Sequence, residues 1–134
     1  MQVLLINPPE QHTLPSNLPE AVEKLRGFTP PLSLMCVAAA VRESGRHEVS
    51  LLDAFALGLT GAALEAAVRK TPPDVVGFSV TTFTLLDTLE AAKSVRKAAP
   101  KAAIVAGGLQ PSLYPEQTAG LEVFDYCFSG EGEL

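Results

Sequence analysis

The residues of this sequence that are best suited to hold a ligand are small, hydroxyl-bearing or glycine, and they follow short apolar runs. Ser79, Thr81 and Thr82 lie at or just after the end of the run DVVGFSV, and the consecutive glycines Gly107 and Gly108 end the run AAIVAGG. Hydroxyls bind neutral polar groups, and glycine lets a bulky guest approach the backbone closely. We therefore expect a binding site. No nucleophile–base pair accompanies these residues, so no catalytic residue is predicted.

Further candidate residues follow the other apolar runs. They are Asn7, Pro8, Asp53, Leu109, Gln110, Gly130 and Glu131. The loops that carry all these candidates contain no lysine, arginine, histidine or cysteine at the candidate edge. This composition favours a wide ligand held by shape, backbone amides and hydroxyls over a compact phosphate held by charge.

Simpler structural roles remain open for these residues. Gly107 and Gly108 could make a tight turn from strand to loop. The hydroxyls of Ser79, Thr81 and Thr82 could cap the next helix, and Asp53 could satisfy loop amides. Glu131 could be a solvated charge of a linker.

The apolar runs alternate with helical patterns along the whole chain. Strands are predicted at residues 2–6, 47–54, 74–80 and 102–108, and a fifth within 124–133. Helices are predicted at 31–45, 60–70 and 85–99, with a short helical turn at 114–120. Thr60 is the expected N-cap of the second helix.

Alternation of this kind predicts an α/β fold, in which each helix connects two parallel strands. Five strands fit a doubly wound, flavodoxin-like (Rossmann-like) parallel sheet of order 2-1-3-4-5. In such sheets a ligand binds at the carboxyl ends of the strands, next to the point where strand order reverses. All the candidate residues belong to that edge.

Composition limits the classes of function. The 134 residues fit one domain, and the net charge of −5 without a basic stripe argues against a nucleic-acid partner. No apolar run reaches the length of a membrane span. The two cysteines lie far apart in apolar surroundings, which is typical of a protein of the reducing cytoplasm, and both Cys36 and Cys127 are predicted to lie in the core.

Common nucleotide-binding motifs are missing. The residues after the first strand read NPPEQH, where a dinucleotide-binding fold would carry G-x-G-x-x-G, and no G-x-x-x-x-G-K-[ST] is present. A receiver domain would need an acidic residue where Ser79 stands. We expect His12 to be a solvated loop residue and His47 to lie at the opposite edge. The proline-rich segment 8–31 is predicted to be a functional lid or poorly ordered, with a possible short helix at 19–27.

Five stretches, in their order along the chain, resemble the cobalamin-binding domain found at the N-terminus of many radical S-adenosylmethionine (radical SAM) proteins. They are VLLINPP (3–9), PPLSLMCVAAAVRESGRHEVSLLDA (30–54), PDVVGFSVTT (73–82), IVAGGLQPS (104–112) and FDYCFSGEGE (124–133).

The resemblance implies that Gly107 and Gly108 let the backbone pack against the nucleotide tail of cobalamin. It also implies that the hydroxyls of Ser79, Thr81 and Thr82 bond this tail or the amides of the corrin. Cobalamin mutases and methionine synthase carry D-x-H-x-x-G after the first strand, with the histidine on cobalt. Here Asn7, Pro9 and His12 occupy the three motif positions. We therefore expect cobalamin to be bound without a protein histidine on cobalt.

The family's cluster-binding motif C-x-x-x-C-x-x-C cannot be made from Cys36 and Cys127. The resemblance therefore implies that the iron–sulfur cluster, S-adenosylmethionine and the methyl transfer or related radical chemistry belong to a downstream domain, and that residues 1–134 are a fragment. The alternatives are a degenerate docking or substrate-recognition domain that does not bind cobalamin, and a small-molecule enzyme that uses Asp53 and Glu131.

Overall fold

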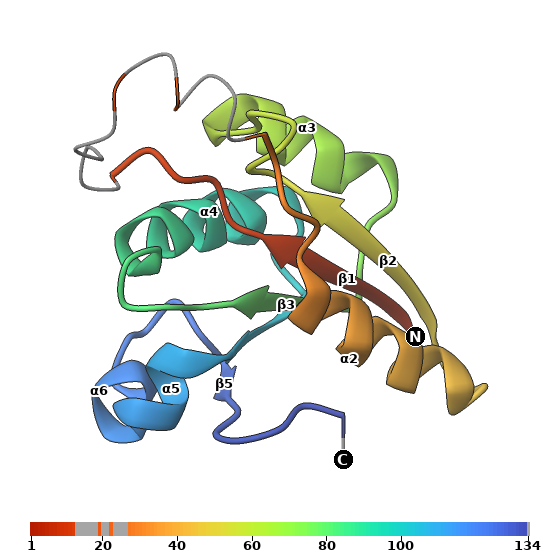
Figure 1. Ribbon diagram of the computed structural model, residues 1–134. Coiled ribbons are helices and arrows are strands. Elements are labelled where there is room, and N and C mark those ends of the chain that lie inside the picture. Colours follow the sequence, from red (N-terminus) through yellow and green to blue (C-terminus); the bar gives the residue numbers. More distant parts are fainter. Residues whose placement is uncertain (13–18, 20–21, 23–26, 134) are drawn as a thin grey trace.

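The structure is a computed structural model, and it describes residues 1–12, 19, 22 and 27–133. Figure 1 shows a single sheet with helices on both of its faces. The sheet has five parallel strands in the order β2-β1-β3-β4-β5, as predicted. The strands are β1 (Gln2–Asn7), β2 (Glu48–Asp53), β3 (Val75–Ser79), β4 (Ala103–Gly107) and β5 (Tyr126–Cys127).

The helices fall close to their predicted positions. They are α2 (Leu32–Glu43), α3 (Gly61–Lys70), α4 (Leu85–Ala98), α5 (Leu109–Leu113) and α6 (Pro115–Ala119). Helix α5 was not predicted, because its sequence LQPSL combines a proline with turn-forming residues. Thr60 is at the N-cap of α3 but makes no side-chain capping bond there. The helix predicted at 19–27 lies mostly outside the described residues.

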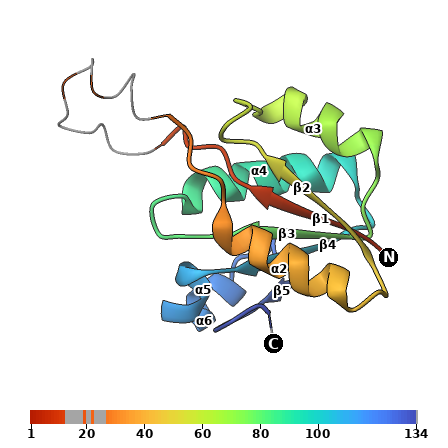
Figure 2. The same ribbon diagram turned by 45° about the vertical axis from the view of Figure 1, so that its right-hand side comes forward.

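Alternate residues of each strand pack on opposite faces of the sheet. The larger core lies on the face of α3 and α4, where Ile6, Phe78 and Ile104 are almost fully buried. A smaller core lies on the other face, where Leu34 and Ala38 of α2 pack with Leu5 of β1. Figure 2 shows α2 in front of the sheet and α3 and α4 behind it. Helix α2 contacts β1 and β2 and so covers one half of its face.

The two cysteines differ in burial. Cys36 is exposed, so its predicted place in the core is wrong. The inward stripe of α2 runs through Leu34 and Ala38, and Cys36 lies about 200° around the helix axis from Leu34. Cys127 is half-buried against the larger core, and desolvation raises the pKa of its thiol. None of the helices in the described ranges has the length and apolar character needed to cross a membrane.

The edge strand β5 is short and is held to β4 by a carboxylate. Asp125 accepts hydrogen bonds from the backbone N–H of Ile104 at 2.7 Å and from Nη2 of Arg96 at 2.6 Å. These two bonds hold the pKa of Asp125 below its ordinary value. Arg96 also donates to the carbonyl of Ala102, so helix α4, strand β4 and the start of β5 meet at one carboxylate.

We expect Asp125→Ala to lower the free energy of unfolding by about 1–2 kcal/mol, because two charge-assisted hydrogen bonds are lost. Urea denaturation measures it, with Glu122→Ala on an exposed residue nearby as the control. The folded-state pKa is lowered, so the contribution of Asp125 is complete above its ordinary pKa of 3.8 and disappears as the pH falls through the lowered value. An equal loss in the two variants at neutral pH would contradict this role.

Candidate ligand-binding edge

The last residues of the central strands form one row across the sheet. Asn7 pairs in register with Asp53, and Ser79 pairs with Gly107. Ile6 pairs with Phe78, so the residues that follow them, Asn7 and Ser79, are neighbours as well. We call the set Asp53, Asn7, Ser79 and Gly107 the rim row. Four candidate residues from four segments of the sequence are thus brought together.

The rim row belongs to the face of the sheet on which α2 packs. Ile6, Phe78 and Ala106 precede the row residues and are buried in the larger core on the opposite face. On the α2 face, Val105 and Gly107 are half-buried. Tyr126 and Phe128, next to them, are 64% and 60% exposed. Parallel sheets are normally covered on both faces, but α2 covers only the β1–β2 half of this one. The segment after β5 reaches α2, where a Cβ on Gly132 would lie 3.1 Å from Cγ2 of Val37.

The two consecutive glycines have different surroundings. Gly108 has a φ of +103°, and a Cβ there would lie 3.0 Å from the carbonyl oxygen of Val80 and 3.1 Å from its nitrogen. This contact arises because Val80 donates to the carbonyl of Gly107 and accepts from the N–H of Gln110. Gly108 therefore has the simpler role of a tight turn. A Cβ on Gly107 would meet nothing closer than the carbonyl oxygen of Phe78 at 4.0 Å, so space is open beside it.

The predicted hydroxyls also separate into two groups. Thr81 exchanges hydrogen bonds with Thr84 and so closes the turn that precedes α4, which itself has no side-chain capping bond. Thr82 donates to Oε1 of the buried Gln110 at 2.8 Å and so joins the loop after β3 to α5. Ser79 is half-buried in the rim row, and its hydroxyl has no hydrogen bond to any residue that the structure describes. Of the three, only Ser79 has a hydroxyl without a hydrogen-bond partner in the described part of the chain.

The acidic candidates are not arranged for catalysis. Asp53 accepts from Nδ2 of Asn7 at 2.9 Å and from the N–H of Ala56 at 3.0 Å, so it holds its own loop and the end of β1. Glu131 is exposed. Among the described residues, no three His, Cys, Asp or Glu side chains are grouped to hold a metal ion.

Ser112, which sequence analysis missed, connects two glycine-containing segments of the edge. Its Oγ donates to the carbonyl of Gly108 at 2.8 Å and accepts from the N–H of Gly130 at 3.0 Å. The spacing of four residues between Gly108 and Ser112 is typical of a serine that bonds back within a helix, but this is visible only once α5 is known. Gly130 has a φ of +95° and is exposed.

The other candidate residues have structural places. Pro8 is fully buried after β1. Leu109 begins α5 and is 56% exposed, whereas Gln110 is only 6% exposed. His47 lies before β2 at the opposite edge, as expected. His12 is exposed as expected, but its ring is paired with the buried carboxylate of Asp87, a residue that sequence analysis did not consider.

Comparison with known proteins shows what the chain as a whole is similar to. A family model described as a B12 binding domain matches residues 21–134. A protein of Pyrococcus horikoshii, named as an uncharacterized methyltransferase, is 32% identical over 136 residues, which cover 100% of this chain and 28% of that protein.

A solved structure has the same fold. It is the radical S-adenosylmethionine methyltransferase TsrM from Kitasatospora setae, with a tryptophan substrate and an S-adenosylmethionine analogue bound. The TM-score is 0.74 at 22% identity, over 98% of this chain and 23% of that chain. At this identity the likeness shows the fold alone. The chain thus spans about a quarter of the length of both proteins.

The two glycines should respond differently to the same substitution. Gly108→Ala should lower the free energy of unfolding by about 1–3 kcal/mol, because an alanine is forced into a left-handed conformation against the backbone of Val80. Gly107→Ala should leave stability unchanged or raise it by about 0.5 kcal/mol, because its position is open and alanine loses less backbone entropy. Thermal and urea unfolding measure both. Equal destabilisation by the two variants would show that the assignment is wrong.

Proposed function

The chain belongs to the B12-binding domain family, and on that premise we propose that it is a module that holds cobalamin for a separate radical S-adenosylmethionine domain. The observation that carries the proposal is the rim row, which offers open space beside Gly107 and, on Ser79, a hydroxyl that bonds none of the described residues. The residues present fit the cofactor. Cobalamin is wide, its corrin carries neutral amides, and its nucleotide tail needs a path along the protein.

The chain's own residues have distinct tasks in this proposal. Gly107 leaves room for the nucleotide tail to lie against β4. Ser79 donates or accepts a hydrogen bond at the tail or at a corrin amide. Asn7 and Asp53 hold each other across β1 and β2, so their end of the row is rigid. When bound, cobalamin supplies a cobalt centre that can carry a methyl group, and the protein supplies position and surroundings.

The exposed apolar side chains beside the row support a wide apolar guest. Tyr126 of β5 and Phe128, which follows it, are exposed on the same face as the rim row. Val105 of β4 pairs with Tyr126 and so lies beside them. An anionic ligand would gain little here, because the described residues of the row offer no cation. Burying this apolar surface against a large ring system would be favourable by about 25 cal/mol per Å².

The remainder of the proposed assembly lies outside this chain. The relatives are longer, and one solved relative is a radical S-adenosylmethionine methyltransferase. We propose that an iron–sulfur cluster and S-adenosylmethionine belong to such a further domain, and that methyl transfer is the reaction of the whole protein. The second candidate function, a docking domain without cobalamin, is favoured only by the structural roles of Thr81 and Gly108 in turns.

Hydroxocobalamin should remain on the folded protein after desalting, as read by its visible absorption. Gly107→Leu should abolish retention without loss of fold, because the side chain fills the open space. Ala103→Leu is the matched control, since it adds the same bulk to the same face of β4 at the other end of the strand. Ser79→Ala should weaken binding about fivefold, as expected for one hydrogen bond of about 1 kcal/mol, whereas Ser50→Ala on β2 should not.

A folded wild-type chain that retains no cobalamin would favour the docking function. Retention by Gly107→Leu equal to that of wild type would instead place the cofactor away from the rim row. Circular dichroism and unfolding curves of each variant separate loss of binding from loss of fold.

We also propose that no histidine of this chain ligates cobalt. His12 stands where the D-x-H-x-x-G motif has its glycine, and its Nδ1 already pairs with Asp87. The visible spectrum of bound cobalamin should therefore be the same in wild type and in His12→Ala. A shift of the absorption bands in His12→Ala, at saturating protein, would mean that Nε2 of His12 is a ligand.

A further inference from the structure

The hydroxyl of Ser112 joins two segments of the ligand-binding edge. Its Oγ donates to the carbonyl of Gly108 at 2.8 Å and accepts from the backbone N–H of Gly130 at 3.0 Å. A serine hydroxyl has one proton to donate and lone pairs that accept, and both capacities are used here. Hydrogen bonds that follow one another in this way polarise and strengthen each other. We call the two bonds, from Gly130 through Ser112 to Gly108, the Ser112 link.

Only one of the two bonds is explained by the local structure of α5. The backbone N–H of Ser112 also lies 3.3 Å from the carbonyl oxygen of Gly108, and a serine in a helix commonly bonds back to the carbonyl four residues earlier. The bond to Gly130 has no such explanation, because Gly130 lies 18 residues away and follows β5. This second bond therefore points to a role for Ser112 outside its own helix.

The segment after β5 (residues 129–133) is exposed and has little else to hold it. Strand β5 has two residues, and Phe128, directly after it, donates its backbone N–H to the carbonyl of Ala106. Beyond Phe128, the bond from Gly130 to Ser112 is the one hydrogen bond that joins this segment to the rest of the described chain. The position of the segment therefore depends strongly on the Ser112 link.

Past the link, the segment runs along the face of the sheet to which the rim row belongs. Gly130 has a φ of +95°, a left-handed conformation that glycine adopts without steric cost and that allows a sharp turn. Two residues later, Gly132 lies against Val37 of α2. In the sheet, β4 and β3 lie between β5 and the strands that α2 covers. The segment thus passes the β3–β4 half of this face on its way from β5 towards α2 (Figure 1).

The segment passes this half of the face without filling the space beside Gly107. A Cβ on Gly107 would meet no atom of the segment within 4 Å. Tyr126 and Phe128 also stay more than half exposed on the same face. The segment therefore borders the open space and does not occupy it. A ligand that lies beside Gly107 would have the segment as a neighbour.

We propose that Ser112 is a positioning residue of the ligand-binding edge, whose hydroxyl holds the segment after β5 at the border of the space beside Gly107. The ligand arm of this proposal rests on the function proposed above, whereas the Ser112 link itself does not. Without the hydroxyl, Gly130 loses its bond to α5 and the segment samples other positions. The fraction of molecules with the border in place falls, and the apparent affinity for a ligand falls with that fraction.

Substitutions at this one position separate the hydroxyl from the shape of the side chain. Ser112→Thr keeps a hydroxyl that can bond the carbonyl four residues earlier. Ser112→Val has the shape of threonine with a methyl group in place of the hydroxyl, and Ser112→Ala removes the hydroxyl without adding bulk. Ser129→Ala is the control, because Ser129 is exposed in the same segment and bonds none of the residues that the structure describes.

NMR on the chain without ligand tests the Ser112 link. In Ser112→Ala and Ser112→Val, the amide of Gly130 should exchange with water about fivefold faster, which is the effect of losing one net hydrogen bond. The backbone order parameters of residues 129–132 should fall below about 0.6. Ser112→Thr and Ser129→Ala should match wild type. The protection of strand amides should be the same in all variants, which shows that the fold is kept.

Titration with hydroxocobalamin tests the positioning role. Ser112→Ala and Ser112→Val should raise the Kd about threefold to fivefold, whereas Ser112→Thr and Ser129→Ala should bind as tightly as wild type. A merely structural role would give a different result. It would lower the urea midpoint of Ser112→Val and leave the Kd of the folded chain unchanged.

Each outcome decides a separate claim. Equal exchange of the Gly130 amide in wild type, Ser112→Ala and Ser112→Val overturns the link. A released segment with an unchanged Kd overturns the positioning role, and so does equal weakening of binding in Ser112→Thr and Ser112→Val. If wild type binds no hydroxocobalamin, the proposed function fails and the positioning role fails with it, while the NMR measurements still decide the link.

Discussion

Parallel pairing of β1 with both β2 and β3 is the constraint on which the rest of this structure depends. Because β1 has a neighbour on each side, the chain leaves it over one face of the sheet towards β2 and returns over the other face towards β3. Helix α2 and the pair α3 and α4 consequently lie on opposite faces. The carboxyl ends of β1 and β3 are left without a helix directly above them, which is where doubly wound sheets bind their ligands.

The strand register brings the side chains of the rim row together at this opening. Residues that are paired in parallel strands project to the same face, so Asp53, Asn7, Ser79 and Gly107 present one row. A shift of one residue in any of these strands would send its member of the row into the larger core. Such a shift is prevented because the row residues alternate with Ile6, Phe78 and Ala106, which are buried in the larger core. A shift would replace these apolar side chains in the core by polar residues or glycine, and their burial would be lost.

The sequence predicted the strand order, the longer helices and the edge that carries the candidate residues, because these depend on periodicity and on the rules of parallel connection. It could not separate Gly107 from Gly108, since the difference lies in the contact of Gly108 with Val80, which follows β3 and is distant in the sequence. The same limit applies to Ser79 and Thr81, whose hydroxyls differ only in whether Thr84 is near. Cys36 was misplaced because it was assigned to the core from its neighbour Val37, whereas a turn of 100° per residue takes it off the inward stripe of α2. Asp87 was missed because its partner His12 is 75 residues away in the sequence. Ser112 was missed because it lies in α5, a helix that was not predicted, and because Gly130 is 18 residues away.

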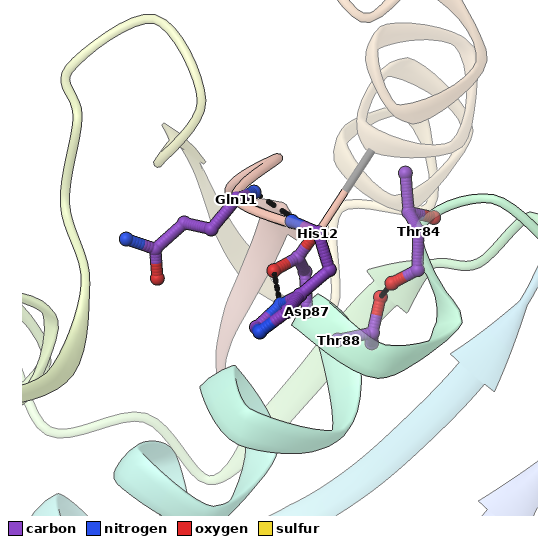
Figure 3. Close-up of polar contacts among 5 residues, drawn as sticks. All are labelled: Gln11, His12, Thr84, Asp87 and Thr88. Atoms are coloured by element: carbon purple, nitrogen blue, oxygen red, sulfur yellow. Dashed lines mark hydrogen bonds and ion pairs between the residues drawn. The ribbon is translucent and has the colours of Figure 1, made fainter. Parts of the chain in front are cut away.

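The start of the loop after β1 is fixed on the face of the sheet opposite to α2. Pro8 and Pro9 are buried directly after Asn7, and Oδ2 of the buried Asp87 accepts from the N–H groups of Gln11 and His12. A buried carboxylate is costly unless it is paired and hydrogen-bonded, so the free energy of these bonds depends on the loop staying beside the first turn of α4. The same carboxylate pairs with the ring of His12 (Figure 3), which explains why a histidine in a loop is not simply solvated.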